Sequence, residues 1–380
     1  MASEDISEPE PSLDSVENPE EHVEPPKPSF HKPTIICIGE YPIKILLRGA
    51  LAEKKDAPLT IFIDKFSRDI AEWSHSRLNP DNVLGLDLNV DTHFWFQVLP
   101  RVENDGALIS RLKDKSIDSG AVVVSSLWDG VGSGLLPALI SQFKEWNTDT
   151  VAFGVLPSQV QVSDVHFNAF SSLGLCASKG FASLLLLDRD QLESFVGVDR
   201  SGSVLKGNNF FNYLLELVSA KETFVQEISE LSRAFDVRIY TILSAAGASL
   251  SMYGSLENIL DSAMSTPLLK CDLSTASVLH VLLRLPLQLK EKLSRGKIEL
   301  EIANWFKKKA RLQSIFISEP LYVEDGNDRI DVVMFVGGFD ASKMFTTMEK
   351  KVRTIKSFVV KKGSIKEDEW RIIVKSLGVE

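Results

Sequence analysis

The stretch from Val122 to Trp146 constrains the fold of this chain more than any other. It reads VVVSSLWDGVGSGLLPALISQFKEW, so an apolar strand runs into a glycine-rich turn and straight out into an amphipathic helix, expected from Leu135 onward. Gly130, Gly132 and Gly134 let the backbone approach a ligand closely, and a helix start directs unpaired N–H groups at an anion. The sequence therefore predicts a phosphate-binding turn.

The front of this turn departs from that chemistry. Trp128 and Asp129 place a bulky ring and a negative charge where a phosphate would lie. A carboxylate about 4 Å from a phosphate charge costs up to roughly 4 kcal/mol at an effective dielectric near 20. We therefore expect these two residues to occlude the site.

Length and charge narrow the class of protein. The chain has 380 residues, 44% of them apolar, which is enough for two domains with full cores. Its net charge of −10 argues against nucleic acid as a partner. Residues 1–33 hold nine acidic groups and seven of the 16 prolines, which predicts a disordered acidic arm. That arm lacks the basic start and apolar run of a signal peptide, so we expect a cytoplasmic protein.

Cysteine and histidine positions give no sign of a metal site. Cys37, Cys176 and Cys271 are far apart and odd in number, and no two of the six histidines have helical ligand spacing. We predict neither a disulfide framework nor bound zinc.

Strand and helix signals alternate through residues 34–207. Apolar strands are expected at residues 34–39, 59–64, 121–126, 150–156 and 181–187, with helices at 43–53, 107–115 and 135–146. Continuously apolar strands separated by helices predict a parallel, Rossmann-like α/β sheet covered on both faces. Ligands of such sheets lie at the carboxyl ends of the strands.

The rest of the chain predicts a connector, a second domain and a tail. Residues 208–235 have the period of one long central helix of about 40 Å. Residues 236–340 predict an α/β domain with a mixed sheet, in which 255–264 and 287–311 are helical and 276–285 is a half-exposed strand. Strands at 314–323 and 329–336 are joined by a hairpin turn at Asp325–Asp328. The tail, 341–380, carries ten Lys or Arg against five acidic residues, as in a solvated basic extension, with an intersubunit or membrane-facing role as the alternative.

Several local strings, in this order, resemble those of the FtsZ/tubulin superfamily over roughly residues 34–340. WDGVGSG at 128–134 stands where that family has its GGGTGSG or GGGTGTG phosphate loop. The other strings are DTVAFGVLPSQ at 149–159, FASLLLLDRDQL at 181–192, SMYG at 251–254, SAMSTPLL at 262–269 and VVMFVGGF at 332–339. The chain is thus similar to a divergent FtsZ-like protein.

The resemblance implies a GTP or GDP site on the first domain, with Mg²⁺ only where GTP is bound. Its contacts would come from Gly39, Asp64, Gly130, Val131, Gly132, Ser133, Gly134 and, toward the base, Asn212. It also implies head-to-tail stacking with copies of itself into a cytoskeletal filament, because an interface between two different surfaces repeats without closing. A conventional FtsZ or tubulin relative and a membrane-anchor protein stay open as further partners.

In that family an acidic loop after the long helix of one subunit completes the hydrolytic site of the next. If Thr241, Ser244 and Gly247 are matched to the family's TVMS…G, the two acidic positions fall on Phe235 and Arg238. Asp236 is one residue out of register, and Glu227 or Glu230 are its possible substitutes. We therefore expect hydrolysis to be impaired or absent, with Asp236 as the candidate catalytic carboxylate.

Three functions follow from these features. The first is a filament-forming scaffold or regulator in cell division or cell shape that has lost most GTP hydrolysis. The second is a working GTPase of the same family with an unusual loop. The third is a dinucleotide-dependent oxidoreductase, which is disfavoured because its glycine fingerprint belongs in the first strand-to-helix turn, where Gly39 is followed by Glu40, Tyr41 and Pro42.

Overall fold

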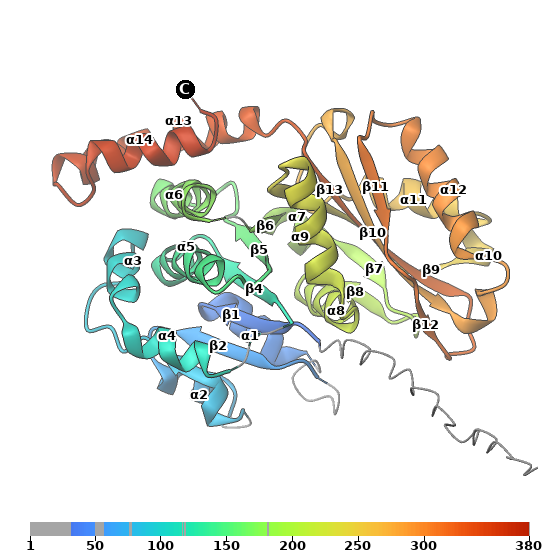
Figure 1. The fold of residues 1–380 in the computed structure, drawn as a ribbon, viewed down its shortest axis with the longest axis horizontal. Helices are drawn as coiled ribbons and strands as arrows, with labels where there is room; N and C mark the ends of the chain where they lie inside the picture. Colours follow the sequence, from blue (N-terminus) through green and yellow to red (C-terminus); the bar gives the residue numbers. More distant parts are fainter. Residues whose placement is uncertain are drawn as a thin grey trace, which may run out of the picture. The chain divides into compact units, whose positions relative to one another are not determined.

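The computed structural model of the protein describes residues 32–49, 57–75, 78–115, 117, 119–180 and 182–379. The predicted acidic arm, apart from its last two residues, lies outside the described residues. The described chain forms an α/β fold around one large sheet (Figure 1).

Eleven strands of the described chain form this sheet. The parallel part has the order β3-β2-β1-β4-β5-β6, and β9, β13, β10 and β11 continue it beyond β6, with β12 also paired to β10. The strands are β1 (Thr34–Ile38), β2 (Thr60–Asp64), β3 (Val83–Gly85), β4 (Ala121–Ser126), β5 (Thr150–Leu156), β6 (Ser183–Asp188), β9 (Ile239–Ser249), β10 (Val278–Pro286), β11 (Ser314–Ile317), β12 (Leu321–Val323) and β13 (Arg329–Gly337). A separate pair is formed by β7 (Val196–Val198) and β8 (Val204–Lys206).

Helices cover both faces of the parallel part, as predicted. In β1, Ile36 and Ile38 join the core under one set of helices, while Ile35 and Cys37 join the core on the other face, because successive side chains point to opposite sides. The first set is α3 (Trp95–Glu103), α4 (Gly106–Lys113), α5 (Gly130–Glu145) and α6 (Ser163–Lys179). The second is α1 (Glu40–Arg48), α2 (Ser67–Trp73), α7 (Arg189–Ser194), α8 (Gly207–Ala220) and α9 (Phe224–Phe235).

The predicted single connecting helix at 208–235 is wrong. The structure has two helices, α8 and α9, separated by residues 221–223. Lys221 is extended at the break, with ψ 99°, and its ammonium donates to the carbonyl of Glu319. Tertiary contacts of this kind override a helical sequence pattern.

The strand pairing after β9 also differs from the prediction. The hairpin at Asp325–Asp328 does not pair the strands on either side of it, because β11 and β12 run parallel to one edge of β10 and β13 runs antiparallel to the other. β10 is buried along its whole length rather than half-exposed. The α-helices between β9 and β11 are α10 (Leu250–Tyr253), α11 (Leu256–Ser265), close to the predicted range, and α12 (Arg295–Lys307), which is shorter than predicted.

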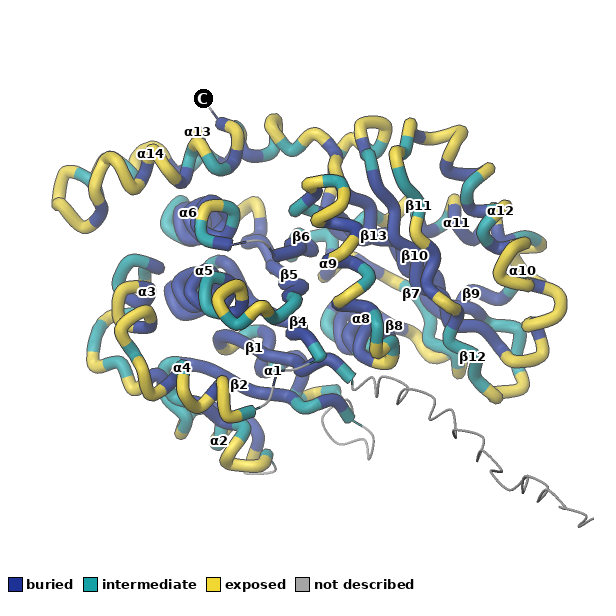
Figure 2. Tube along the Cα trace, viewed as in Figure 1, coloured by how far each residue is buried: buried dark blue, intermediate teal, exposed yellow. Residues whose placement is uncertain are grey.

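The basic tail is a packed helical hairpin rather than a solvated extension. Helices α13 (Ser342–Lys361) and α14 (Glu367–Ser376) lie against α6 (Figure 1). Trp370 stacks on Phe167 of α6, with ring centroids 5.7 Å apart and planes 6° apart. Buried and exposed residues alternate along both helices (Figure 2), as an amphipathic surface helix requires. No helix among the described residues is long and apolar enough to cross a membrane.

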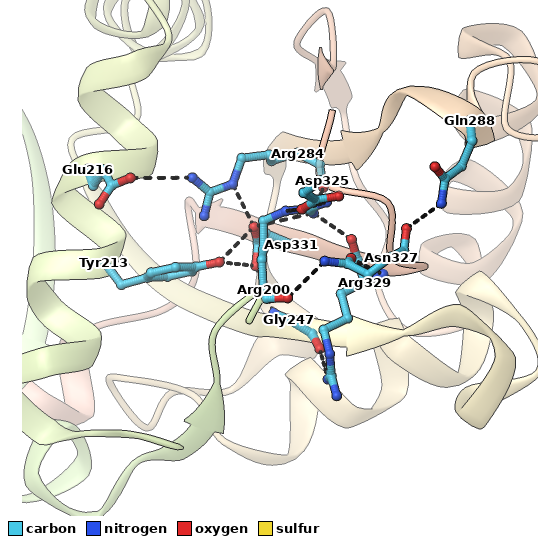
Figure 3. A network of polar contacts seen from close by, with 10 residues as sticks. All are labelled: Arg200, Tyr213, Glu216, Gly247, Arg284, Gln288, Asp325, Asn327, Arg329 and Asp331. Atoms are coloured by element: carbon cyan, nitrogen blue, oxygen red, sulfur yellow. Dashed lines mark hydrogen bonds and ion pairs between the residues drawn. The ribbon is translucent and has the colours of Figure 1, made fainter. Parts of the chain in front are cut away.

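A buried carboxylate ties three strands beyond β6 to helix α8, which covers the parallel part of the sheet (Figure 3). Asp331 of β13, fully buried, accepts hydrogen bonds from the hydroxyl of Tyr213 on α8 (2.8 Å) and the N–H of Gly247 on β9 (2.7 Å). It also pairs with Arg284 of β10, whose Nε lies 2.7 Å away. Burial, and then the Asp331 charge, raises the pKa of Tyr213. A buried charge with this many partners fixes four elements relative to one another.

We expect Gly174→Ala to loosen the contact between α6 and α14. A Cβ on Gly174 would lie 2.6 Å from both Cγ2 and the carbonyl oxygen of Ile373, so α14 would have to move. The free energy of unfolding should fall by about 1–3 kcal/mol, measured by chemical denaturation. The matched control is Gly296→Ala in α12, where a Cβ meets nothing within 4 Å; it should be neutral or stabilising by up to about 1 kcal/mol. Equal effects of the two variants would contradict the packing argument.

Candidate functional site

A pocket of about 400 Å³ lies at the carboxyl ends of β1, β2 and β4. The strand order reverses between β1 and β4, and ligands of open α/β sheets bind in the crevice at such a point. Asp64, Trp128, Asp129 and Val131 of the predicted site all line this pocket. The structure thus brings together part of the site that the sequence predicts.

Asp129 holds the start of α5. The helix begins at Gly130, five residues before the predicted start at Leu135, with Asp129 as its N-cap. Asp129 Oδ1 accepts a hydrogen bond from the backbone N–H of Gly132 at 2.6 Å, and Oδ2 accepts one from the hydroxyl of Ser126. Burial raises the pKa of Asp129, while these hydrogen bonds oppose the rise. The Gly132 N–H, a group of the kind that binds phosphate at helix starts, therefore already donates to a carboxylate of the protein.

The glycines of the turn are explained by packing inside the protein. A Cβ on Gly130 would lie 2.1 Å from the carbonyl oxygen of Thr92, and one on Gly132 would lie 1.9 Å from that of Ser126. At Gly134 the nearest atom, the carbonyl oxygen of Trp95, would be at 2.9 Å. These close contacts are made with the chain's own backbone, and the predicted approach to a ligand stays a prediction. Val131, Ser133 and the three glycines are all buried.

Two aromatic rings and an arginine lie together at the pocket. Trp128 meets Tyr41 edge to face with centroids 4.7 Å apart, and the guanidinium of Arg189 lies 5.2 Å from the Trp128 ring centre. The Tyr41 hydroxyl donates to Asn208 at 3.1 Å, and burial raises the pKa of Tyr41 to about 12. Trp128 therefore has two side-chain partners at the pocket, Tyr41 and Arg189, and its occluding role stays a prediction. We refer to these three residues as the plug.

Sequence reasoning missed Arg189 and Asn208 as pocket residues. Arg189 directly follows the strand end Asp188, and Asn208 lies in the first turn of α8, so both positions were visible near the ends of elements. The pocket also holds Lys44, Arg48 and Lys65. Together with Arg189 these make four cations against the three carboxylates Glu40, Asp64 and Asp129, so cationic side chains for an anionic ligand are present despite Asp129.

Gly39 and Asp64 flank the Asp129 carboxylate. Gly39 has φ +85°, a conformation that favours glycine, and a Cβ there would lie 3.3 Å from Asp129 Oδ2. Burial raises the pKa of Asp64 to about 6, and the charges of Asp129 and Glu40 add to the rise, while the Lys65 N–H opposes it. The residues at the ends of β1 and β2 therefore pack directly beside Asp129.

Asn212 does not line the pocket, contrary to the prediction. Its Nδ2 donates to the carbonyl oxygen of Ile45 on α1 at 2.8 Å, and its amide packs where a Cβ on Gly49 would be 2.7 Å away. The reason is its position along α8, since Asn208 lies one turn earlier on the same face and reaches the pocket instead. Asn212 ties α8 to α1.

Asp236 lies at the opposite end of the parallel strands from the pocket. It caps the end of α9 in a left-handed conformation, φ 50°, with 86% of its side chain exposed, and pairs with Arg238 at 3.9 Å. Asp236 shortly precedes β9, which runs parallel to β6. It therefore lies at the amino ends of the parallel strands. Thr241 and Ser244, the positions matched to the family string, are buried in β9.

Glu227 and Glu230 differ as substitutes for Asp236. Glu230 is exposed on α9. Glu227 accepts from Ser318 and lies 3.0 Å from His280 Nε2. Burial opposes its ionisation, but hydrogen bonds with His280, Ser318 and Thr223 hold its pKa at about 2. Glu227 therefore belongs to the interior.

We expect Asp64→Asn to stabilise the protein at neutral pH. Because the pKa of folded Asp64, about 6, exceeds its ordinary 3.8, folding favours the protonated form. That contribution is complete below pH 3.8 and is lost as the pH rises through about 6. Relative to the wild type, the variant should gain roughly 1–3 kcal/mol of unfolding free energy at pH 7.5 and lose this gain at pH 4. An equal difference at both pH values would contradict the assignment.

Solved structures that share this fold include two CetZ proteins. CetZ from Methanosaeta thermophila superposes with a TM-score of 0.67 over 90% of this chain and 97% of its own, at 16% identity. CetZ1 from Haloferax volcanii, described as a GDP-bound monomer, gives a TM-score of 0.67 over 86% of this chain and 99% of its own, at 17% identity. No protein-family model and no curated protein matches the sequence. The chain therefore has the fold of the FtsZ/tubulin superfamily, as its sequence predicts.

Proposed function

We propose that this chain is a cytoplasmic, FtsZ/tubulin-like cytoskeletal protein that stacks head to tail into protofilaments. It acts as a scaffold or regulator in cell division or cell shape, with weakened GTP binding and impaired or absent hydrolysis. The observation that carries this proposal is the hydrogen bond from the Gly132 N–H to Asp129. A nucleotide phosphate would have to replace that carboxylate at the start of α5.

The electrostatics of the pocket support weak binding. Displacing Asp129 leaves a half-buried carboxylate beside the incoming phosphate, and a pair of like charges about 4 Å apart costs up to roughly 4 kcal/mol at an effective dielectric near 20. The plug residues Tyr41, Trp128 and Arg189 must also move aside. Both costs reduce affinity without removing the pocket.

The short turn that contains Asp236 supports loss of GTP hydrolysis. Only residues 236–238 connect α9 to β9, and Asp236 is the one carboxylate among them. Water activation in a neighbouring subunit needs carboxylates that reach across the interface. A three-residue turn with one acidic group offers little reach, and Glu227 is held inside.

The separation of the two surfaces supports head-to-tail stacking. The pocket lies at the carboxyl ends of the parallel strands, and Asp236 lies at their amino ends. If these two different surfaces meet in successive subunits, the contact repeats without closing and gives a filament.

A second candidate is a working GTPase with the same assembly. The four cations of the pocket favour it, because phosphate binding needs compensating positive charge, and one of the structural relatives is described as GDP-bound. Mg²⁺ would then accompany GTP. Phosphate release that rises with protein concentration would favour this candidate over the first.

We expect the double variant Trp128→Gly with Asp129→Gly to bind GTP at least about tenfold more tightly than the wild type, because it removes the ring and the competing charge. Isothermal titration calorimetry measures the change. The matched control is Asp105→Gly, which removes the N-cap of α4, where Asp105 accepts from the N–H of Ala107 and Leu108. Unchanged affinity in the double variant would mean that this turn is not the phosphate site.

We expect purified protein to form short protofilaments with and without GTP, seen by negative-stain electron microscopy. Nucleotide-independent assembly follows if the Asp129 carboxylate already supplies the negative charge at the α5 start. Filaments that require GTP would instead favour the second candidate. Particles that stay monomeric at all concentrations would contradict assembly altogether.

A further inference from the structure

The hairpin of α13 and α14 is basic, although the chain as a whole is acidic. Residues 342–376 contain ten Lys or Arg against four Asp or Glu, whereas the whole chain has a net charge of −10. The two helices pack on α6, and the turn between them extends past α6 (Figure 1). Positive charge is therefore concentrated on one projecting part of the surface.

The packing of α13 turns its lysines outward. Met348 and Val352 of this helix are buried in the core that it shares with α6. Lys350 follows Lys343 by seven residues and Lys361 follows Lys350 by eleven, which is about two and three helical turns. The three lysines therefore share one face, opposite the buried residues, and all three are exposed.

The carboxylates of the hairpin are already in use, whereas many of its lysines are not. Each of the four carboxylates has a partner within the hairpin: Arg353 for Glu349 (2.9 Å), Lys356 for Glu367 (2.7 Å), Arg371 for Asp368 (3.4 Å) and the backbone N–H of Lys366 for Glu369 (2.7 Å). Among the described residues, six exposed lysines of the hairpin have no carboxylate partner: Lys343, Lys350, Lys361, Lys362, Lys366 and Lys375. The unpaired charge of the hairpin is positive.

Lys343 has acidic surroundings that the lysines nearer the turn lack. It lines a second and larger pocket, about 670 Å³, at the carboxyl ends of β5 and β6. Four carboxylates line the same pocket and offset its charge: Asp188, Asp190, Asp272 and Asp340. The other lysines along the outer side of α13 and in the turn do not line it: Lys350, Lys361, Lys362 and Lys366. We refer to these four as the basic edge.

An exposed aromatic ring lies within the basic edge. Phe358, in the last turn of α13, is 53% exposed, and the ammonium of Lys362 lies 4.4 Å from its ring centre. A ring in this setting can enter the boundary between lipid headgroups and acyl chains, while the lysine ammonium groups stay among the headgroups.

We propose that this hairpin docks on the surface of an anionic lipid bilayer, with the basic edge against the headgroups and Phe358 inserted between them. Clusters of about four to eight Lys or Arg on an amphipathic helix are attracted to the negative surface potential of such a membrane. This docking does not depend on nucleotide binding or on assembly.

The kind of cation favours a membrane over a single acidic group. Lysine is a compact point charge that suits a plane of many headgroups, whereas arginine suits bidentate contact with one carboxylate or phosphate. Both arginines of the hairpin, Arg353 and Arg371, are already paired. What remains for a partner is lysine charge and one apolar ring.

The test is flotation of the full chain with lipid vesicles on a density gradient, a readout that protein filaments alone do not give. Vesicles of phosphatidylcholine with about 30 mol% phosphatidylserine should carry the protein upward, and vesicles of phosphatidylcholine alone should carry at least about tenfold less. Binding to the anionic vesicles should be lost at about 1 M NaCl, where the Debye length is about 3 Å.

Variants assign this binding to residues. Lys361→Gln with Lys362→Gln and Lys366→Gln should weaken binding to the anionic vesicles at least about tenfold, because each lysine near the membrane contributes roughly fivefold. Phe358→Ser should weaken it about threefold to tenfold, because a half-exposed ring no longer enters the boundary. Leu300→Ser, at a position of α12 that is 62% exposed, is its control and should leave binding unchanged.

The matched control for the lysines is Lys290→Gln with Lys292→Gln and Lys307→Gln. It removes the same charge from exposed positions before and within α12. Lys290 also lies over an aromatic ring, 5.1 Å from the centre of Tyr322, as Lys362 does in the hairpin. This triple variant should float like the wild type.

Four results would overturn the proposal. These are the absence of flotation of the wild type with anionic vesicles, equal flotation with anionic and neutral vesicles, equal losses in the two triple-lysine variants, or binding of a short DNA duplex where no protein floats. The last result would make nucleic acid the partner of the basic edge. Because flotation is scored without filaments, it can fail while head-to-tail assembly holds, and the reverse.

Discussion

The buried Asp331 carboxylate is the contact on which the arrangement of this molecule depends. The parallel half of the sheet meets the other half through β6 and β9, which are in register over only two residue pairs. Asp331 strengthens this narrow joint by holding Tyr213, Gly247 and Arg284, which come from three further elements. Removing one partner of such a buried charge is far more costly than removing an exposed ion pair.

That joint sets the relation between the two pockets. Both open at carboxyl ends of the parallel strands, but the plug pocket lies at β1, β2 and β4 and the larger pocket lies at β5 and β6. The larger pocket needs both halves, because its wall combines Leu156 of β5 with Phe339 after β13. The pocket that holds the plug residues is lined only by residues that precede β9, so the second half of the sheet contributes nothing to its wall. The larger pocket therefore depends directly on how the second half is anchored, whereas the pocket with the plug residues depends on it only indirectly.

The parallel sheet and its glycine turn could be predicted, because buried strands and tight turns leave strong local patterns. The broken connector, the burial of β10 and the packing of the tail could not. Each depends on contacts distant in sequence, such as Lys221 with Glu319 or Trp370 with Phe167. The contact of Asn212 with a base stays a prediction, although Asn208, one turn earlier on α8, is the asparagine that lines the pocket. The division into two domains stays a prediction, since both halves share one sheet.

In the first turn of α5, the small size of the glycines and the charge at the helix start have separate causes. Gly130 and Gly132 must be small because Thr92 and Ser126 press against them, whether or not any ligand is present. The presence of such glycines is therefore explained by packing and does not by itself indicate a bound ligand. The side chain just before the first glycine is the more informative position, because the Asp129 carboxylate accepts a hydrogen bond at the start of α5 and places a negative charge at the positive end of the helix dipole.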